Sequence, residues 1–479
     1  MRLRTTAGWL VAAVGLVFLM TGSAQANNIA VTNVALPNQD VVAKTVNVAF
    51  DLAWDNSWRG SENWDAAWVF VKFRAPGSNN WQHATLSTNS VDHKPAANST
   101  IAAVSDGAGV FVYRSSGYTG SVNYAQIKLL WNYGTNGYSF AKGALVEVSV
   151  HAIEMVYVPA GPFYLGSGGS ETISHFYRFT DGTQSTNPYL VAAESAITVG
   201  IVDGYLYYTA PGGNDCDGGS PIPDAFPKGY TAFYCMKYEI SQGQYADFLN
   251  KLTGTQWTNR NTGANYASYR HTIHGGCTNS IADVPDRACN FLAWAHLLAY
   301  ADWAALRPMT ELECEKACRG PAYPVPDEYA WGSASYTAIA SETGSGGTVT
   351  SGTPGANINF GGISGPTRVG IFATNNATRV LAGAGYYGVM DLSGNIFESA
   401  IGVGTVAGRA FTGACGDGIL DASGNFNTAN WPATVSEYRG GQYINGVVNY
   451  QKVSARVPTG SSWADHNDSY GGRAVRQAP

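Results

Sequence analysis

The sequence predicts an α+β protein in which an N-terminal all-β sandwich precedes a larger domain of short helices, short strands and long loops. Residues 27–152 contain short runs of alternating apolar and polar side chains separated by turn-forming residues. Residues 153–479 contain capped helical segments followed by irregular sequence. The 479 residues also exceed what one hydrophobic core usually organises, so we expect two domains.

The first 26 residues have the features of a secretory signal peptide. Arg2 and Arg4 form a positively charged start, residues 8–20 form an apolar run, and Ala24 and Ala26 form a small-residue cleavage site. The apolar run is shorter than the roughly 20 residues that span a bilayer. We therefore expect a mature protein that is secreted, extracellular or periplasmic, and that has no membrane span after cleavage.

Composition narrows the classes of partner. Charged residues make up 13% of the chain and the net charge is -6, so no basic surface for nucleic acid is expected. The seven cysteines would enter an oxidising compartment, where disulfides form. By spacing, Cys216 with Cys235 and Cys277 with Cys289 are the pairs that loops could join, and the odd total leaves one thiol over.

The N-terminal domain is expected over residues 27–152. Its predicted strands contain residues 46–52, 68–73, 110–113, 127–131 and 146–150. Five tryptophans are close in sequence, at positions 54, 58, 64, 68 and 81. Exposed indoles would form a platform for carbohydrate or protein, whereas buried ones would fill the sandwich core. The burial preference of large apolar side chains favours the core.

The second domain, residues 153–479, is expected to open with a strand, a turn and a strand at 154–166. A stretch rich in Gly, Ser and Thr follows at about 167–229, and its apolar piece at 196–208 could be an inserted hairpin. Long insertions often carry binding or contact functions.

Three helices are expected after this insertion. Ser241 is the predicted N-cap of the first, whose apolar side chains between 245 and 252 share one face. The second covers residues 290–303.

The third predicted helix carries the most complete end signals. Thr310 and Glu313 form a capping box, and Gly320 is a helix stop. Cys314 and Cys318 lie one turn apart, a spacing unlike that of zinc sites, so we expect them on a buried helical face.

Ordered segments of this domain resemble the formylglycine-generating enzyme family, also called sulfatase-modifying factors. Residues 154–166 resemble its M-V-x-V-P-x-G-x-F-x-M-G opening, residues 307–320 its R-L-P-T-E-A-E-W-E-x-A-A-R-G segment, and residues 388–398 its G-L-x-D-M-x-G-N-V-W-E-W segment. Residues 439–445 resemble the start of its R-G-G-S segment. The resemblance covers about residues 154–476 and implies a fold similar to C-type lectins, with long loops pinned by calcium.

The resemblance implies two structural calcium sites. For the first it implies Glu398 as the side-chain ligand, with the Asn395 amide in or near the shell and carbonyl ligands near three further residues, Ser393, Gly394 and Ile396. Calcium prefers six to eight oxygens, many of them carbonyls.

The second site would begin at Asn357 and Ile358, which match the family's A-N-I segment. The acidic element that completes this site in the family is not evident in residues 361–374. The alternative for both segments is that Asn and Glu only hydrogen-bond their own turns.

The family's copper chemistry is not expected here. In the family, two cysteines after R-G-G-S bind copper and oxidise a substrate cysteine, and soft Cu(I) prefers sulfur. This chain has Gln442 at the serine position, Asn445 at the first cysteine position, and Asn449 or Tyr450 near the second. Ser399 stands where the family has tryptophan.

A pair of histidines and three C-terminal arginines are further candidates for functional or structural roles. Relatives with nonheme iron rely on three histidines, but His271 and His274 form the only tight pair here and favour a surface pair. Three arginines near the C-terminus are expected to pair with buried carboxylates or carbonyls: Arg456, Arg473 and Arg476.

These observations favour a secreted, non-catalytic relative of the sulfatase-modifying factors that acts in extracellular binding or self-assembly, as a surface layer or filament. The expected partner is a protein or glycan at the cell surface, or a second copy of the chain. The alternatives are an enzyme of the same superfamily with a non-standard active site and a calcium-dependent carbohydrate-binding protein.

Overall fold

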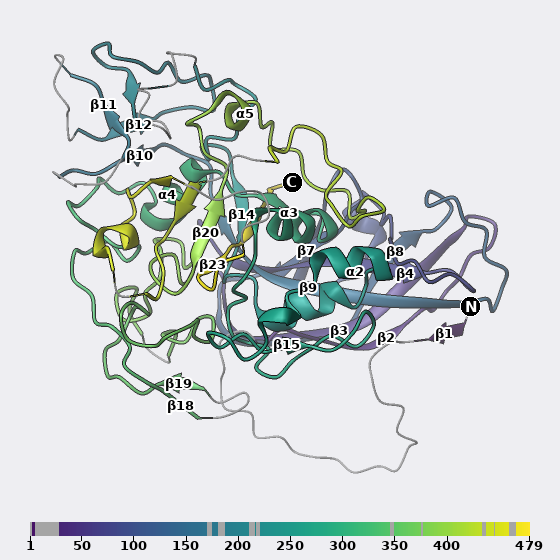
Figure 1. Ribbon diagram of the computed structural model, residues 1–479. Helices are drawn as coiled ribbons and strands as arrows, with labels where there is room; N and C mark the ends of the chain where they lie inside the picture. The colour runs from purple at the N-terminus through teal and green to yellow at the C-terminus, as the bar shows by residue number, and fades with distance from the viewer. Residues whose placement is uncertain are drawn as a thin grey trace. The chain divides into compact units, whose positions relative to one another are not determined.

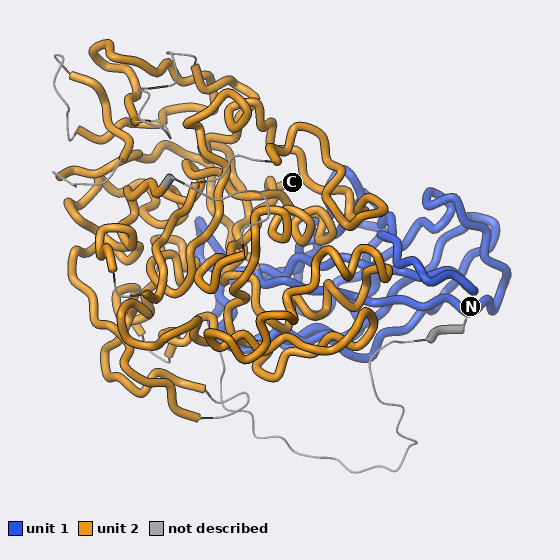
Figure 2. The backbone as a smooth tube through the Cα atoms, in the orientation of Figure 1, with its two compact units in different colours: residues 1–154, 479 blue, residues 155–478 orange. Residues whose placement is uncertain are grey.

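The computed structural model describes residues 2–4, 28–169, 175–180, 187–209, 216, 221–344, 349–374, 377–433, 437–444, 446–458 and 466–479. Most of the predicted signal peptide lies outside these residues. The chain divides into two compact units, unit 1 (Met1–Glu154 with Pro479) and unit 2 (Met155–Ala478), as Figure 2 shows. The long strand β9 (Leu145–Val158) contributes residues to both units.

Unit 1 is built from β-strands. Its elements are β1 (Arg2–Arg4), β2 (Ala30–Ala35), β3 (Thr45–Trp58), β4 (Asp65–Arg74), β5 (Gln82–His83), the 3-10 helix η1 (Ser90–Asp92), β6 (Ser99–Ala103), β7 (Val110–Arg114), β8 (Thr119–Asn132) and β9. One sheet places β9, β4, β7 and β6 side by side, with β5 on β4 and β1 on β9, and a second has the order β2-β3-β8 (Figure 1). All five predicted strand segments lie within these strands.

Both sheets of unit 1 contribute to one hydrophobic cluster. Because side chains alternate across a strand, every second residue of β3 from Val46 to Trp54 and of β4 from Ala67 to Phe73 belongs to it. Matching residues of β8, such as Ile127, Leu129 and Trp131, complete it from the second sheet. A two-layer sandwich is the interpretation that accounts for this shared core.

The tryptophans of unit 1 serve the interior rather than an open platform. Trp54 and Trp68 are 1% and 0% exposed, and the Trp54 indole N–H donates to Asp65 at 2.9 Å. The remaining three of the five are half-buried: Trp58, Trp64 and Trp81.

Unit 2 combines short helices with many short strands. Its helices are α1 (Gln242–Leu249), α2 (Gly254–Arg260), η3 (Gly263–Asn265), α3 (Trp294–Trp303), α4 (Glu311–Arg319), α5 (Val406–Arg409) and η5 (Val448–Gln451). Its strands are β10 (Phe163–Leu165), β11 (Tyr177–Arg178), β12 (Tyr189–Val191), β13 (Leu206–Tyr207), β14 (Phe233–Met236), β15 (Ile273–His274), β16 (Ile281–Ala282), β17 (Arg307–Pro308), β18 (Glu342–Thr343), β19 (Thr350–Ser351), β20 (Phe397–Ala400), β21 (Glu437–Arg439), β22 (Val457–Pro458), β23 (Tyr470–Gly471) and β24 (Ala474–Gln477).

Two sets of paired strands in unit 2 position its C-terminal segments. The last residues of β9 pair with β14, which pairs with β24, and β24 pairs with β17. A separate four-stranded sheet has the order β22-β21-β20-β23. In the insertion, β13 pairs with β11 and Ile197 bridges Ile222, so the apolar piece at 196–208 pairs with segments before and after it and is not a self-contained hairpin.

The helix signals in the sequence are confirmed, with one shifted boundary. Ser241 caps α1 through a capping box with Gln244, and Thr310 caps α4 in the same way with Glu313. Helix α3 begins at Trp294, four residues later than predicted, because Phe291 has a φ of 60°, outside the right-handed helical region.

The cysteines differ from the spacing-based prediction. All seven are free thiols, so neither Cys216 with Cys235 nor Cys277 with Cys289 is bonded. The physical reason is that the two members of the first pair pack in different places: Cys216 lies against the Tyr208 carbonyl, and Cys235 lies within β14. The buried helical face predicted for the cysteines of α4 is confirmed, since both are at most 3% exposed.

No helix among the described residues is long and apolar enough to cross a membrane.

Candidate functional site

The two C-terminal motifs come together in unit 2. Strand β20, which ends the first motif, pairs with β21, which begins the second. The Gly394 amide donates to the Gly440 carbonyl at 2.7 Å, and the Tyr443 amide donates to the Asn395 carbonyl at 2.8 Å. Segments more than forty residues apart thus form one local structure, which we call the motif site.

The turn before β20 requires glycine at one position. Gly394 has a φ of 86°, and a Cβ atom there would lie 2.4 Å from Cγ1 of Ile358. Asn395 follows with a φ of 66°, a left-handed conformation that Asn tolerates better than most residues. The turn therefore packs directly against the Asn357–Ile358 segment, which is the other predicted calcium-binding segment.

The polar side chains of this turn already have protein partners. Asn395 Oδ1 accepts hydrogen bonds from the Thr367 amide at 2.8 Å and hydroxyl at 3.1 Å, and its Nδ2 donates to Glu239 at 2.6 Å. Ser393 Oγ accepts from the Ala330 amide at 3.0 Å. The backbone of Ile396 lies in the same turn and donates to Glu239 at 3.4 Å.

Glu398 forms a buried bidentate ion pair with Arg473. Arg473 Nε and Nη2 donate to the two carboxylate oxygens at 2.5 and 2.6 Å, and the side chains are 0% and 2% exposed. Arg473 also donates to the carbonyls of Met236 and Met390. The predicted pairing of this arginine with a buried carboxylate is confirmed, and it ties β20, β14 and the turn together.

The second predicted calcium segment is also hydrogen-bonded internally. Asn357 Oδ1 accepts from the Thr337 amide at 2.9 Å, and its Nδ2 donates to the Val380 carbonyl at 3.0 Å. The Ile358 carbonyl accepts from the Ile339 amide at 2.9 Å.

In the described conformation, the oxygen atoms of these two segments do not form a calcium-binding site. Calcium needs six to eight oxygens, and a carboxylate is the usual charged ligand. Both oxygens of Glu398 face a guanidinium instead, and the amide oxygens of Asn395 and Asn357 accept protein hydrogen bonds. Within the described residues, no group of three or more His, Cys, Asp and Glu could hold a metal ion. In the described conformation the turn is held by these hydrogen bonds and by Arg473.

Three buried carboxyl groups lie near Arg473. Burial raises the pKa of Glu239 well above its usual value, and the charges of Asp391 and Glu398 raise it further. Burial also raises the pKa of Asp391 to about 6. Arg473 lowers all three pKa values, so its positive charge stabilises the whole group.

Aromatic rings fill the region beside β20 and β21. The Phe397 ring stacks on Tyr438 with centroids 5.2 Å apart, and Tyr438 lies 4.5 Å from Tyr470. The Tyr450 ring packs on Phe397 at 6.1 Å. Phe397 and Tyr438 are each 5% exposed. This aromatic cluster leaves the face of the sheet apolar.

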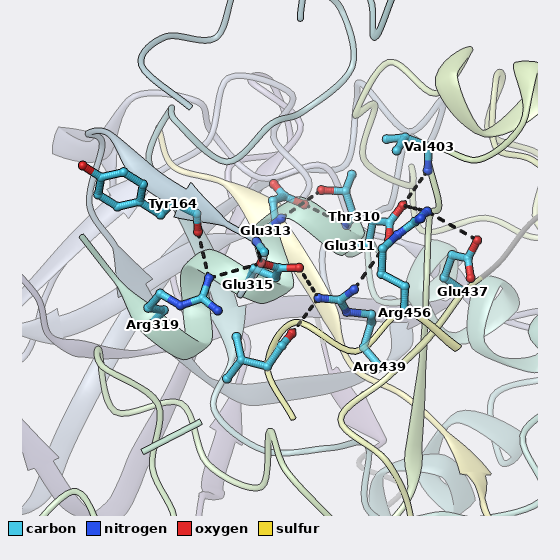
Figure 3. Close-up of polar contacts among 12 residues, drawn as sticks. Tyr164, Thr310, Glu311, Glu313, Glu315, Arg319, Val403, Glu437, Arg439 and Arg456 are labelled. Atoms are coloured by element: carbon cyan, nitrogen blue, oxygen red, sulfur yellow. Dashed lines mark hydrogen bonds and ion pairs between the residues drawn. The ribbon is translucent and has the colours of Figure 1, made fainter. Parts of the chain in front are cut away.

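A chain of buried charges runs from α4 to the C-terminal strands (Figure 3). Its members alternate in sign: Arg319, Glu315, Arg439, Glu311, Arg456 and Glu437. Arg439 Nη2 donates to Glu315 at 2.6 Å, and Arg456 Nε donates to Glu311 at 2.7 Å. Burial raises the pKa of Glu437, the last member, to about 7.

The sequence alone predicted only part of this row of buried charges. It anticipated the buried pairing of Arg456 and, outside this set of charges, the carbonyl contact of Arg476, which donates to Ala305. It missed Glu311, Glu315 and Arg439. The available signal was the i,i+4 spacing of the two glutamates, which places both on one helix face.

The histidine pair is separated by folding. His271 is 0% exposed and its Nδ1 contacts Asn290 Oδ1 at 2.9 Å, whereas the half-exposed His274 contacts Asp283 at 2.9 Å. The surface-pair interpretation was therefore wrong for His271. His271 lies just before β15, and Ile273, the first residue of that strand, is buried as well.

Comparison with protein families supports the motif assignment. The model of the sulfatase-modifying factor enzyme 1-like domain matches residues 144–478. The chain belongs to this family. No match to the chain was found among curated proteins. At the positions singled out in the sequence, Ser399 is buried opposite Tyr438, Gln442 is half-buried, and Asn449 and Tyr450 lie on η5. Asn445 lies outside the described residues.

Proposed function

We propose that this sulfatase-modifying factor domain is non-catalytic and acts outside the cytoplasm in binding or self-assembly. The observation that carries the proposal is the missing cysteine pair: Asn445 stands at the first cysteine position, Asn449 or Tyr450 near the second, and no cysteine follows Cys415.

The surroundings of these positions support the loss of copper chemistry. Tyr450 packs on Phe397, which stacks on Tyr438, so aromatic rings occupy the neighbourhood in which two thiolates would be needed. Cu(I) requires soft sulfur ligands, and phenol rings do not supply them. The buried ion pairs of Glu398 and Arg439 keep the scaffold folded without depending on that chemistry.

A contact role is supported by the composition of the chain. Only 13% of the residues are charged and the net charge is -6, so weak electrostatic repulsion opposes association. The partner is a protein or glycan at the cell surface or a second copy of the chain. The five tryptophans between positions 54 and 81 do not favour the carbohydrate alternative, because each is buried or half-buried.

The test uses the mature protein purified after secretion. Elemental analysis is expected to show no stoichiometric copper, and incubation with oxygen and a cysteine-containing peptide is expected to leave the thiol unchanged. A catalytic member of the family, treated identically, is the positive control. Stoichiometric copper or loss of the peptide thiol overturns the non-catalytic proposal.

Self-assembly has its own measurement. Light scattering over a range of concentrations and negative-stain microscopy are expected to show particles larger than the monomer. A monomer at every concentration overturns self-assembly and leaves binding to another molecule as the remaining role.

A further inference from the structure

A cleft in unit 2 lies apart from the motif site in sequence. Its volume is about 590 Å³, within the range of small-molecule binding pockets. It is lined by Arg270 and Arg287 and by residues on and around the β18–β19 pair, among them Glu342 and Val349. We call it the arginine cleft.

The arginine cleft holds more positive than negative charge among its lining residues. Arg270 pairs closely with Glu342 Oε2, and Arg287 Nη2 lies 4.0 Å from the same oxygen. The other oxygen of Glu342 accepts the Arg368 amide at 3.1 Å. The carboxylate of Glu342 thus interacts with two guanidinium groups and a backbone amide. Its negative charge is shared between the two arginines, so the charge of Arg287 is only partly neutralised.

Each of the two lining arginines has one buried N–H group without an acceptor. The Nε atoms of Arg270 and Arg287 are buried and have no hydrogen-bond partner in the part of the chain that the structure describes. Buried donors normally have a partner, and leaving a charged one unsatisfied is unfavourable. Burial, together with the neighbouring charge of Arg270, lowers the pKa of Arg287 to about 10, the direction expected for a cation short of anions.

The backbone holds Arg270 in an uncommon conformation. Ala267, Tyr269 and Arg270 have left-handed φ angles of 64°, 44° and 66°. Gly365 permits close packing there, since a Cβ atom at that position would lie 2.9 Å from the Arg270 Cγ and Cδ atoms. Such conformations persist only where the surroundings enforce them, and they cluster at ligand-binding sites.

We propose that the arginine cleft binds a small organic anion, with Arg287 and Arg270 donating to its carboxylate, sulfate or phosphate group. An oxyanion supplies negative charge that the single carboxylate of Glu342 only partly provides to the two guanidinium groups, and arginine matches its geometry. The cleft volume lies within the range of pockets that bind small organic molecules. The anionic group therefore belongs to a molecule of about the size of an acidic sugar. This site does not depend on the proposed non-catalytic role.

Calorimetric titration of the mature chain at low ionic strength tests the proposal. The probes are glucuronate, glucose 6-sulfate and glucose 6-phosphate, which separate the three anionic groups, and glucose, which is neutral. We expect saturable 1:1 binding of at least one anion with a Kd below about 1 mM, and none for glucose. Absence of saturable binding for all three anions up to about 10 mM overturns the proposal.

Charge variants decide whether the cleft is responsible. Arg287→Gln is expected to weaken binding by about tenfold or more, because it removes a charge-assisted donor. Glu342→Gln is expected to strengthen it several-fold, because it removes a competing carboxylate. Arg178→Gln, at an exposed arginine of β11, is the matched control and is expected to change nothing.

The two lining variants are expected to change the affinity in opposite directions, so misfolding cannot explain both results. Circular dichroism checks that each is folded, and Glu342→Gln decides alone if Arg287→Gln is not. Unchanged affinity in the folded lining variants overturns the proposal. Equal weakening by Arg178→Gln and Arg287→Gln shows diffuse surface attraction and overturns it as well.

Discussion

Replacing Arg473 with methionine should destabilise unit 2 strongly. The substitution keeps much of the side-chain length but leaves Glu398, which is 2% exposed at its side chain, without its bidentate partner. Breaking a buried ion pair by removing one member costs about 3–5 kcal/mol of unfolding free energy. The nearby buried carboxyls of Glu239 and Asp391 place the loss at pH 7 toward the upper end, because Arg473 stabilises their charges too.

The assay is urea denaturation of the full chain, followed by circular dichroism and fluorescence. Arg178→Met, at an exposed arginine, is the control and should change the unfolding free energy by less than about 0.5 kcal/mol. The double variant Arg473→Met with Glu398→Gln should be less destabilised than Arg473→Met alone, because the uncompensated charge is gone. The loss in Arg473→Met should shrink as the pH is lowered below 7, because the pKa values of the three carboxyls are raised and protonation removes the uncompensated charge.

Comparing the Tm with and without a calcium chelator tests whether Arg473 or calcium is the partner of Glu398. If Arg473 holds Glu398 as described, a chelator should leave the Tm of the wild type unchanged. A clear fall in Tm with chelator, reversed by calcium, would show that calcium is the partner of Glu398. A loss of less than about 1 kcal/mol in Arg473→Met would equally refute the reasoning.

Three further outcomes are expected. His271 should make the fold less stable as the pH falls, because burial lowers its pKa to about 4 in the folded chain, against 6.5 in the unfolded chain. The unfolded chain therefore binds the proton first, and about 3 kcal/mol of unfolding free energy is lost between pH 6.5 and 4. His271→Gln should flatten this part of the plot of unfolding free energy against pH, and an unchanged plot would contradict the assignment. Thiol titration should find seven free cysteines in the unfolded chain but fast reaction only at Cys277 and Cys415 in the native chain, since the other five are buried; fewer than seven would indicate a disulfide. Gly394→Ala should lower the unfolding free energy by at least about 1 kcal/mol in urea, because its φ is positive and the new Cβ meets Ile358, whereas Gly254→Ala, with open space around it, is the control and should not.

Features set by near neighbours in the chain were predictable. The caps at Ser241 and Thr310 depend on residues three positions away, and both capping boxes are present. The alternation that predicted the strands of unit 1 depends on the two-residue period of a strand, and it placed every segment in a strand. The ordered motifs likewise identified the family that residues 144–478 match.

Contacts between distant segments were not predictable in the same way. Glu398 was expected to face calcium, but folding brings Arg473, 75 residues later, against both of its oxygens. Helix α3 starts late because Phe291 adopts a left-handed φ, and His271, just before β15, is buried with its Nδ1 in contact with Asn290. In each case a long-range contact overrides a local pattern.

The sequence by itself determined the family, the helix caps and the loss of the cysteine pair, because these are written in residue identities and short spacings. Only the tertiary structure decided which charges meet. It joined Arg439 to Glu315 across 124 residues and gathered Arg270, Arg287 and Glu342 around one cleft. The physical reason is that a buried charge must find a partner in space, and chain separation does not reveal which partner the fold supplies.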